Sequence, residues 1–217
     1  MKRFILLIIV ISGVMTVYGQ KNYPEPEFTK EVYYLKKDSV YSVVRLEKDN
    51  SAMESKTKMG GLGGSESGYS MEGGRSPIRL NSGSDLSFVL STGASAKKSS
   101  PQMDSVMRAN GMDPAMAQNM GDMMMDPISM ISLYKAETGK DKRKIVMQKT
   151  PGAMPFGSKK MKTGDKYSFS VRKIRDGYWE LVIDKTLPKG EYVFTMMDMM
   201  GMSGGGYNSI LFAFGID

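Results

Sequence analysis

Apolar and polar residues alternate in short runs along most of this 217-residue chain, and turn-forming residues separate the runs. In a β-strand successive side chains point to opposite faces of the sheet, so a period of two is the pattern of half-buried strands. Glycine, proline, asparagine and aspartate between the runs are typical of turns. The pattern predicts strands over residues 29–36, 40–47, 52–59, 78–80, 85–91, 129–136, 144–148, 166–174, 178–184, 191–197 and 209–214.

The run over 178–184 shows the alternation clearly. Trp179, Leu181 and Ile183 share one face, and Glu180 lies on the other. A strand of this kind in an antiparallel sheet has one face in the core and one face in water. We therefore expect Trp179 to pack in the core and Glu180 to face solvent.

Two other features predict how strands are arranged. Asp176-Gly177 separates the runs 166–174 and 178–184, and Asp-Gly favours the tight turn of a β-hairpin, so these two strands should pair antiparallel. Residues 210–214 are apolar at every position. A strand without a polar face is covered on both sides, which predicts a central position in its sheet.

Many short strands without a long helical pattern are typical of an all-β fold. We predict one antiparallel β-sandwich or jelly-roll-like domain over residues 29–217, preceded by a leader over 20–28. Two segments interrupt the strand pattern. A glycine- and serine-rich stretch over 60–74 is expected to be a flexible loop, and a methionine-rich insertion over 93–127 is expected to be partly helical or disordered.

The insertion contains the sequence signals of two short helices. Pro101 follows a serine that can cap a helix N-terminus, and Asn110-Gly111 supplies a stop. Pro114 follows an aspartate in the same way. These signals predict helices over 101–109 and 114–120. Both are shorter than the roughly 12–15 residues at which an isolated helix becomes marginally stable, so they need a surface to pack on.

The first 19 residues have the layout of a secretory signal peptide. Two basic residues precede an apolar run over 4–17, and Val17 and Gly19 have the small side chains that a cleavage site before Gln20 requires. The run is shorter than the roughly 20 apolar residues of a membrane span, and no later stretch is longer. We expect an exported protein, periplasmic or extracellular, with no transmembrane segment in the mature chain.

The composition excludes much catalytic and metal chemistry, because the chain has no histidine and no cysteine. It lacks the residues for a Ser-His-Asp triad, a thiolate nucleophile, a tetrahedral zinc site, a blue-copper centre or an iron–sulfur cluster. Ser55 to Lys58 and Lys162-Thr163-Gly164 match short motifs of penicillin-recognising serine enzymes. However, Ser55 lies in a strand pattern where that family needs a helix start. We expect a non-enzyme, with carboxylate or Ser-Lys chemistry as the catalytic alternative.

Basic residues exceed acidic residues by nine between positions 135 and 176. One interpretation is a solvated strand surface whose charges prevent edge-to-edge aggregation. The other is a patch for an anionic partner, such as an envelope lipid or glycan. We expect no nucleic-acid binding, because aromatic residues that would stack on bases do not interleave with these lysines. The candidate patch residues are Lys142, Arg143, Lys144, Lys159, Lys160, Lys162, Arg172, Lys173 and Arg175.

Methionine accounts for 22 of the 217 residues, and the methionines cluster in 103–130 and 196–202. Several in the first cluster are four residues apart, so a helix would place them on one face. Thioether sulfur is a soft ligand that suits Cu(I) or Ag(I). The alternatives are an adaptable apolar contact surface and ordinary core packing, which Met196 is expected to show. The candidate metal ligands are Met112, Met116, Met120, Met123, Met124 and Met125.

Two parts of the chain resemble known proteins. The segment from Gly190-Glu191-Tyr192 to Phe214-Gly215-Ile216-Asp217 resembles the closing strands of small exported bacterial β-proteins that have no assigned activity, which implies a β-fold and no function. Met112-Asp113, Met116, Met120 and the run from Gly121 to Asp126 (GDMMMD) resemble Met/Asp-rich segments of periplasmic copper-resistance proteins. Those segments usually contain histidine as well. The second resemblance implies Cu(I) or Ag(I) binding.

The sequence therefore supports two functional hypotheses. The first is an exported, non-enzymatic interaction or envelope-associated module without a cofactor, which contacts an unknown protein or an anionic envelope component through its methionine-rich insertion. The second is a periplasmic protein that binds Cu(I) or Ag(I). Both require methionine side chains that face outward. The second methionine cluster joins the first only if the fold brings the loop at 201–206 near the insertion.

Overall fold

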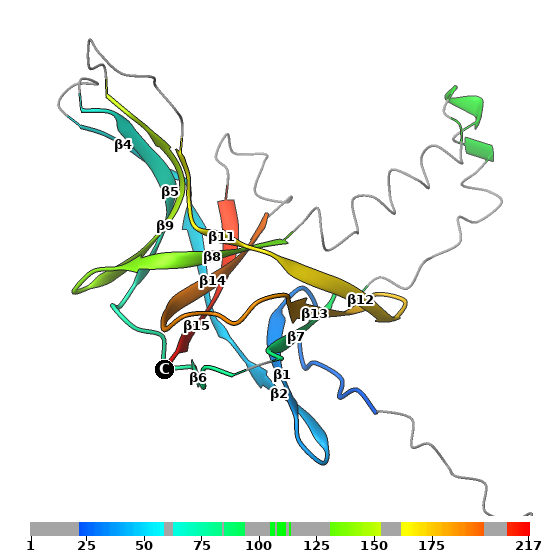
Figure 1. Ribbon diagram of the computed structural model, residues 1–217. Helices are drawn as coiled ribbons and strands as arrows, with labels where there is room; N and C mark the ends of the chain where they lie inside the picture. Colours follow the sequence, from blue (N-terminus) through cyan, green and yellow to red (C-terminus); the bar gives the residue numbers. More distant parts are fainter. Residues whose placement is uncertain are drawn as a thin grey trace, which may run out of the picture.

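The computed structural model describes residues 22–58, 63–83, 85–93, 105–106, 108–111, 113, 131–152, 162–197 and 208–217. These residues form two β-sheets that pack in a sandwich-like arrangement (Figure 1). Among them, every strand pair is antiparallel except the pair between β15 and the two-residue β6. The predicted all-β sandwich is therefore confirmed.

The smaller sheet forms one layer of the sandwich. Its five strands follow the order β12 (Phe169–Arg175), β13 (Tyr178–Ile183), β7 (Ser87–Ser91), β1 (Val32–Lys37) and β2 (Tyr41–Arg45). The predicted hairpin at Asp176-Gly177 is confirmed, since β12 and β13 pair antiparallel across it. Gly177 has a φ of 68°, which a residue without a side chain adopts without strain.

The larger sheet has ten strands. Its main order is β3 (Glu47–Ala52), β15 (Asn208–Ile216), β14 (Gly190–Met197), β8 (Ile131–Thr138), β9 (Lys142–Thr150), β5 (Ser65–Glu72) and β4 (Glu54–Thr57). Three short strands join it at the side, namely β6 (Arg79–Leu80), β10 (Lys162–Thr163) and β11 (Lys166–Tyr167). The central position predicted for the C-terminal strand is confirmed, because β15 lies between β3 and β14.

Aromatic side chains fill the space between the two sheets. Phe88 of β7 contacts Phe194 of β14 and Phe214 of β15, each with a ring-centroid distance of 4.9 Å. All three side chains are completely buried. A second, smaller apolar cluster, which includes Leu211 and Ala213, covers the opposite face of β15. Burial on both faces explains why this strand has no polar side.

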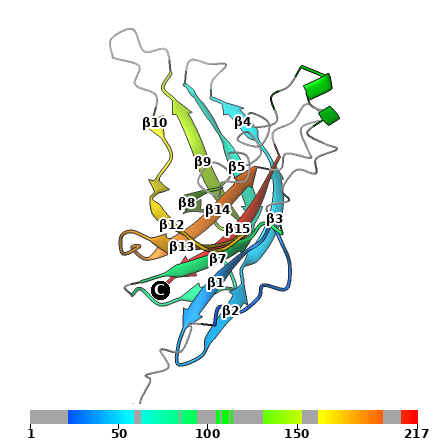
Figure 2. The ribbon, with the colours of Figure 1, turned by 90° about the vertical axis from the view of Figure 1, so that its right-hand side faces the viewer.

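The larger sheet continues beyond the sandwich as a ribbon of β4, β5 and β9, which both views show rising away from the body (Figures 1 and 2). The expected loop over 60–74 is wrong for β5. Tyr69 and Met71 alternate with polar residues and are buried, so they anchor this strand in the second apolar cluster. Gly68 permits a bulge here, because a Cβ at this position would lie 2.0 Å from the carbonyl oxygen of Ile145.

The expected solvent exposure of Glu180 is also wrong. Its side chain is completely buried, and the ammonium of Lys37 lies 2.7 Å from its carboxylate. The segment that precedes β1 covers this outer face of the smaller sheet, where the Tyr23 hydroxyl donates a hydrogen bond to Glu180 over 3.0 Å. Trp179, which was expected in the core, is only half-buried. Part of the segment expected to form a leader thus contacts the sheet, through the Tyr23 hydroxyl and through the carbonyl oxygen of Pro24, which accepts a hydrogen bond from Tyr178.

Part of the methionine-rich insertion is helical, as predicted. Residues 105–106 and 108–109 are helical, and Gly111 has a φ of 74°, which agrees with a helix stop at Asn110-Gly111. The helix predicted over 114–120 lies outside the described residues, as does the predicted signal peptide. Where the structure is described, no helix is long and apolar enough to cross a membrane.

Candidate functional site

Strand β8, which follows the first methionine-rich segment, and strands β14 and β15, which flank the second, are neighbours in the larger sheet. β14 ends at Met197, which is paired with Ser209 of β15. β8 begins at Ile131, which is paired with Met196 of β14. The end of β3, which Met53 follows directly, is paired with the start of β15. We call the end of the sheet formed by these residues the methionine end.

Two methionines at the methionine end are exposed. Met197 is 63% exposed and Met53 is 40% exposed. Met197 and Ser51 are both paired with Ser209 of β15, so their Cα atoms lie two strand spacings apart, or about 10 Å. Met53 is two residues beyond Ser51 along the same chain. The described surface of this end therefore presents thioether groups to solvent.

Other methionines pack inside the protein. Met196 is 3% exposed and belongs to the same apolar cluster as Tyr192 and Phe194, so its predicted core position is confirmed. Met71 is buried in the second cluster, and Met147 is half-buried against it. The described methionines thus fall into two groups. Met71 and Met196 fill the core, whereas Met53 and Met197 are exposed to solvent.

The candidate metal ligands Met112, Met116, Met120, Met123, Met124 and Met125 all lie outside the described residues. The chain that carries them enters β8 at the methionine end, and the second cluster connects β14 to β15 at the same end. The start of β8 and the end of β14, to which the two clusters are attached, are thus adjacent, although Ile131 and Met196 are more than 60 positions apart in sequence. The described residues contain no group of three or more acidic side chains that could hold a metal ion.

The structure divides the candidate basic residues between two places. Lys142, Arg143 and Lys144 lie on β9 of the larger sheet, and Arg172, Lys173 and Arg175 lie on β12 of the smaller sheet. Lys162 lies in β10, while Lys159 and Lys160 are outside the described residues. Surface ion pairs join Lys142 to Glu72, Lys173 to Asp176 and Arg175 to Glu25. Partial neutralisation by these carboxylates weakens any attraction for an anionic partner.

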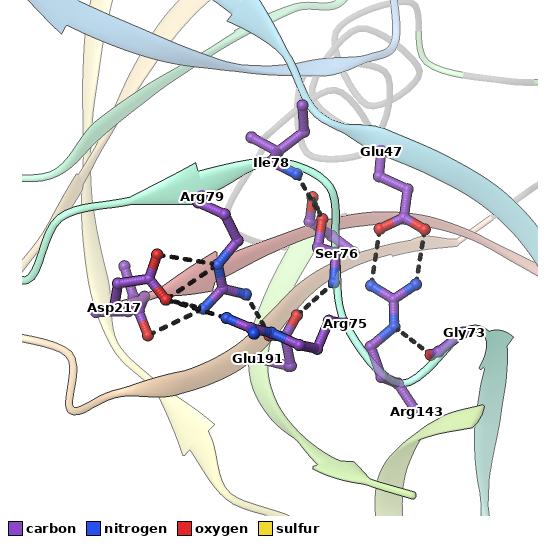
Figure 3. Close-up of polar contacts among 11 residues, drawn as sticks. Glu47, Gly73, Arg75, Ser76, Ile78, Arg79, Arg143, Glu191 and Asp217 are labelled. Carbon is purple, nitrogen blue, oxygen red and sulfur yellow. Dashed lines mark hydrogen bonds and ion pairs between the residues drawn. The ribbon is translucent and has the colours of Figure 1, made fainter. Parts of the chain in front are cut away.

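Arg143 does not belong to an exposed basic patch, because its side chain is completely buried. Figure 3 shows its guanidinium facing the carboxylate of Glu47. Its guanidinium donates two hydrogen bonds to the carboxylate of Glu47, over 2.7 and 2.6 Å. It also donates to the carbonyl oxygens of Gly73 and Glu72, over 2.9 and 2.8 Å. This ion pair joins β9 to β3 across the second apolar cluster. A buried charge with all of its partners in the protein has a structural role.

A second group of charged residues lies close to the C-terminal end of β15 (Figure 3). The guanidinium of Arg79 is bound between the buried carboxylate of Glu191 and the exposed carboxylate of Asp217. Glu191 also accepts a hydrogen bond of 2.8 Å from the backbone N–H of Ser76. The Arg79 guanidinium passes so close to Gly215 that a Cβ there would lie 1.6 Å from its nitrogen. These contacts fasten β6 and the segment before it to β14 and to the C-terminal end of the chain.

Sequence reasoning did not identify either charged group. Their members are far apart in sequence, with 112 positions between Arg79 and Glu191 and 96 between Arg143 and Glu47. One local signal was present, since Gly215 interrupts an otherwise apolar strand. A glycine inside a strand often marks the close approach of another group. It did not reveal which group approaches.

Two buried carboxylates, Glu180 in β13 and Glu31 directly before β1, have lowered pKa values. Burial by itself would raise the pKa of Glu180, but hydrogen bonds from Lys37 and Arg172 outweigh that effect and hold the pKa below its usual range. Burial likewise opposes ionisation of Glu31, and hydrogen bonds from Arg45 and Lys48 lower its pKa. Both groups are therefore ionised in the folded protein at neutral pH, and each is held by two cations.

We expect the conformational stability of the protein to fall in acid, because a carboxylate with a lowered folded-state pKa binds protons more tightly when unfolded. The stability that Glu180 contributes is complete above its unfolded pKa of about 4.3 and is lost as the pH falls through the lower folded-state pKa. Urea unfolding from pH 7 to pH 3 should show this decrease, and Glu180→Gln should flatten it. Phe88→Leu, which lowers stability but keeps every carboxylate, should retain the wild-type slope. An unchanged slope in Glu180→Gln contradicts the assignment.

Comparisons with known proteins do not assign the chain to a protein family. No family model, no curated protein and no solved structure matches it. Any functional conclusion therefore depends on the residues and geometry of this chain alone.

Proposed function

We propose that this protein is an exported, non-enzymatic interaction or envelope-associated module, and that the methionine end is its contact surface. The observation that carries the proposal is that the start of β8, which follows the first methionine-rich segment, is paired with the end of β14, at which the second segment begins. Exposed Met53 and Met197 at the same end add to this surface. A rigid sheet would thus present many flexible apolar side chains to one partner.

Methionine suits such a surface for a physical reason. Its unbranched side chain has three rotatable bonds and a polarizable sulfur, so it adapts to partners of different shape. An anionic lipid or glycan is a less favoured partner, because basic residues on β9 and β12 are already paired with carboxylates of the protein. The partner favoured by these features is a protein or envelope component with an apolar surface, and no cofactor is required.

The second candidate function is binding of Cu(I) or Ag(I). The pairing of β8 with β14 favours it as well, because thioether ligands from the two segments attached there would be available to one ion. Thioethers bind these soft ions without releasing a proton, and an exported protein is outside the reducing cytosol. The ligands would be Met112, Met116, Met120, Met123, Met124 and Met125, with Met53 and Met197 beside them.

One pair of variants separates the two functions. Leucine at the six candidate positions keeps an apolar surface but removes the sulfur, whereas glutamine at the same positions removes both properties. If the protein is an interaction module, the leucine variant should stay bound to isolated envelope fractions in co-sedimentation. The glutamine variant should bind at least about tenfold more weakly, since each buried methionine contributes roughly 1.5–3 kcal/mol.

Metal binding predicts a different result for the leucine variant. In an anaerobic Cu(I) titration against a competing chelator, the wild-type protein should bind saturably and both variants should lose that binding. If both variants co-sediment like the wild type, and neither the wild type nor either variant binds Cu(I), both proposed functions are wrong. Met71→Leu is the matched control, because this methionine is buried and should affect neither measurement.

A further inference from the structure

The edge strand β2 differs from the edge strands β12, β3 and β4 of the described sheets. β12, β3 and β4 carry charged side chains, which hinder pairing with another chain. In β2, residues 41–44 are uncharged (Tyr-Ser-Val-Val), and the only charge is on Arg45. Glu31 compensates that charge through an ion pair of 2.8 Å. Among the described residues, no strand pairs with the outer edge of β2.

The hairpin formed by β1 and β2 also projects from the body, at the end opposite to the ribbon of β4, β5 and β9 (Figures 1 and 2). It exposes apolar side chains, since Val40 in its turn is 80% exposed and Val44 is 38% exposed. A projecting, uncharged edge with unpaired N–H and C=O groups is the feature that natural β-proteins usually avoid. Its presence here indicates that the edge has a partner.

We propose that β2 pairs antiparallel with β2 of a second copy of this chain, so that the two five-stranded sheets become one continuous sheet. A two-fold axis through Val43 places Val43 opposite Val43 of the second copy. It also places Ser42 opposite Val44 and Tyr41 opposite Arg45. This register opposes no like charges, because each Arg45 lies opposite the uncharged Tyr41.

A charge-exchange experiment tests the pairing. Ser42 and Val44 are both exposed, so Ser42→Lys/Val44→Lys and Ser42→Glu/Val44→Glu should fold like the wild type. In sedimentation velocity the wild-type protein should be dimeric. Each variant alone should dissociate with a Kd at least about tenfold higher, because like charges oppose each other in two places. An equimolar mixture of the two variants should restore the dimer.

The absence of cysteine allows a second test of the register. Directly opposed residues in an antiparallel pair have Cα atoms about 4.5–5.5 Å apart, which is within the range of a disulfide. Val43→Cys should therefore form a covalent dimer under mild oxidation. Ser55→Cys, on the edge strand β4, is the matched control and should stay monomeric on non-reducing gels.

A wild-type protein that sediments as a monomer at all concentrations overturns the proposal. So does a dimer that persists in both charge variants or that Val43→Cys does not cross-link, since its interface would then lie elsewhere. Ser55→Lys/Thr57→Lys adds the same charges to the edge strand β4 and should leave the dimer intact.

Discussion

Glu47→Ala is expected to destabilise the protein by about 3–5 kcal/mol, because it leaves the buried guanidinium of Arg143 without its carboxylate. For a chain of this length, that loss corresponds to a decrease in Tm of roughly 10 °C. The effect is large because Arg143 is completely buried and water cannot replace the lost partner. Thermal and urea unfolding, each monitored by circular dichroism, measure it.

The matched control is Glu137→Ala. Glu137 forms an ion pair of 2.7 Å with Lys149, but both side chains are largely solvent-exposed, at 58% and 40%. Exposed pairs contribute only about 0–1 kcal/mol, so this variant should unfold almost as the wild type does. If the two variants lose the same stability, the burial of Arg143 is not what makes its ion pair important.

Phe88→Ala is expected to destabilise the protein by a similar amount, about 3–5 kcal/mol. Phe88 is the side chain of the smaller sheet that contacts both Phe194 and Phe214 of the larger sheet. Its removal leaves a cavity between the sheets and eliminates two aromatic contacts. Urea unfolding should show one transition with a lower midpoint.

Two further variants show whether this loss comes from packing between the sheets. Phe88→Leu keeps most of the apolar volume and should cost less than about 1.5 kcal/mol. Phe28→Ala removes a ring that is 42% exposed and should cost less than about 1 kcal/mol. If Phe88→Ala unfolds like Phe28→Ala, the two sheets do not share the core described above.

The strands could be predicted because each depends on a local pattern. The hairpin at Asp176-Gly177, the double-sided burial of β15 and the core position of Met196 all follow from side-chain alternation and turn chemistry within a few residues. The pattern did not predict strand β5, because its serines, Gly68 and the glycines on either side of the strand resemble a loop. The alternation of Tyr69 and Met71 with polar residues was nevertheless present.

Glu180 shows where a local pattern fails. Its position opposite Trp179 and Leu181 predicted exposure, and the orientation of its side chain agrees with that pattern. The segment over 22–28 and the cations of Lys37 and Arg172 then cover it. Which chain segment covers a given face depends on contacts more than 150 positions apart, so one strand's alternation contains no information about it.

By itself, the sequence determined the all-β class, the positions of most strands and the absence of histidine and cysteine chemistry, because these depend on composition and on neighbouring residues. Only the tertiary structure decided that both methionine-rich segments attach to one end of the larger sheet, that Arg143 is buried and that β2 is an open edge. The physical reason is that strand order and register arise from contacts between distant segments, which the pattern within any single strand does not specify.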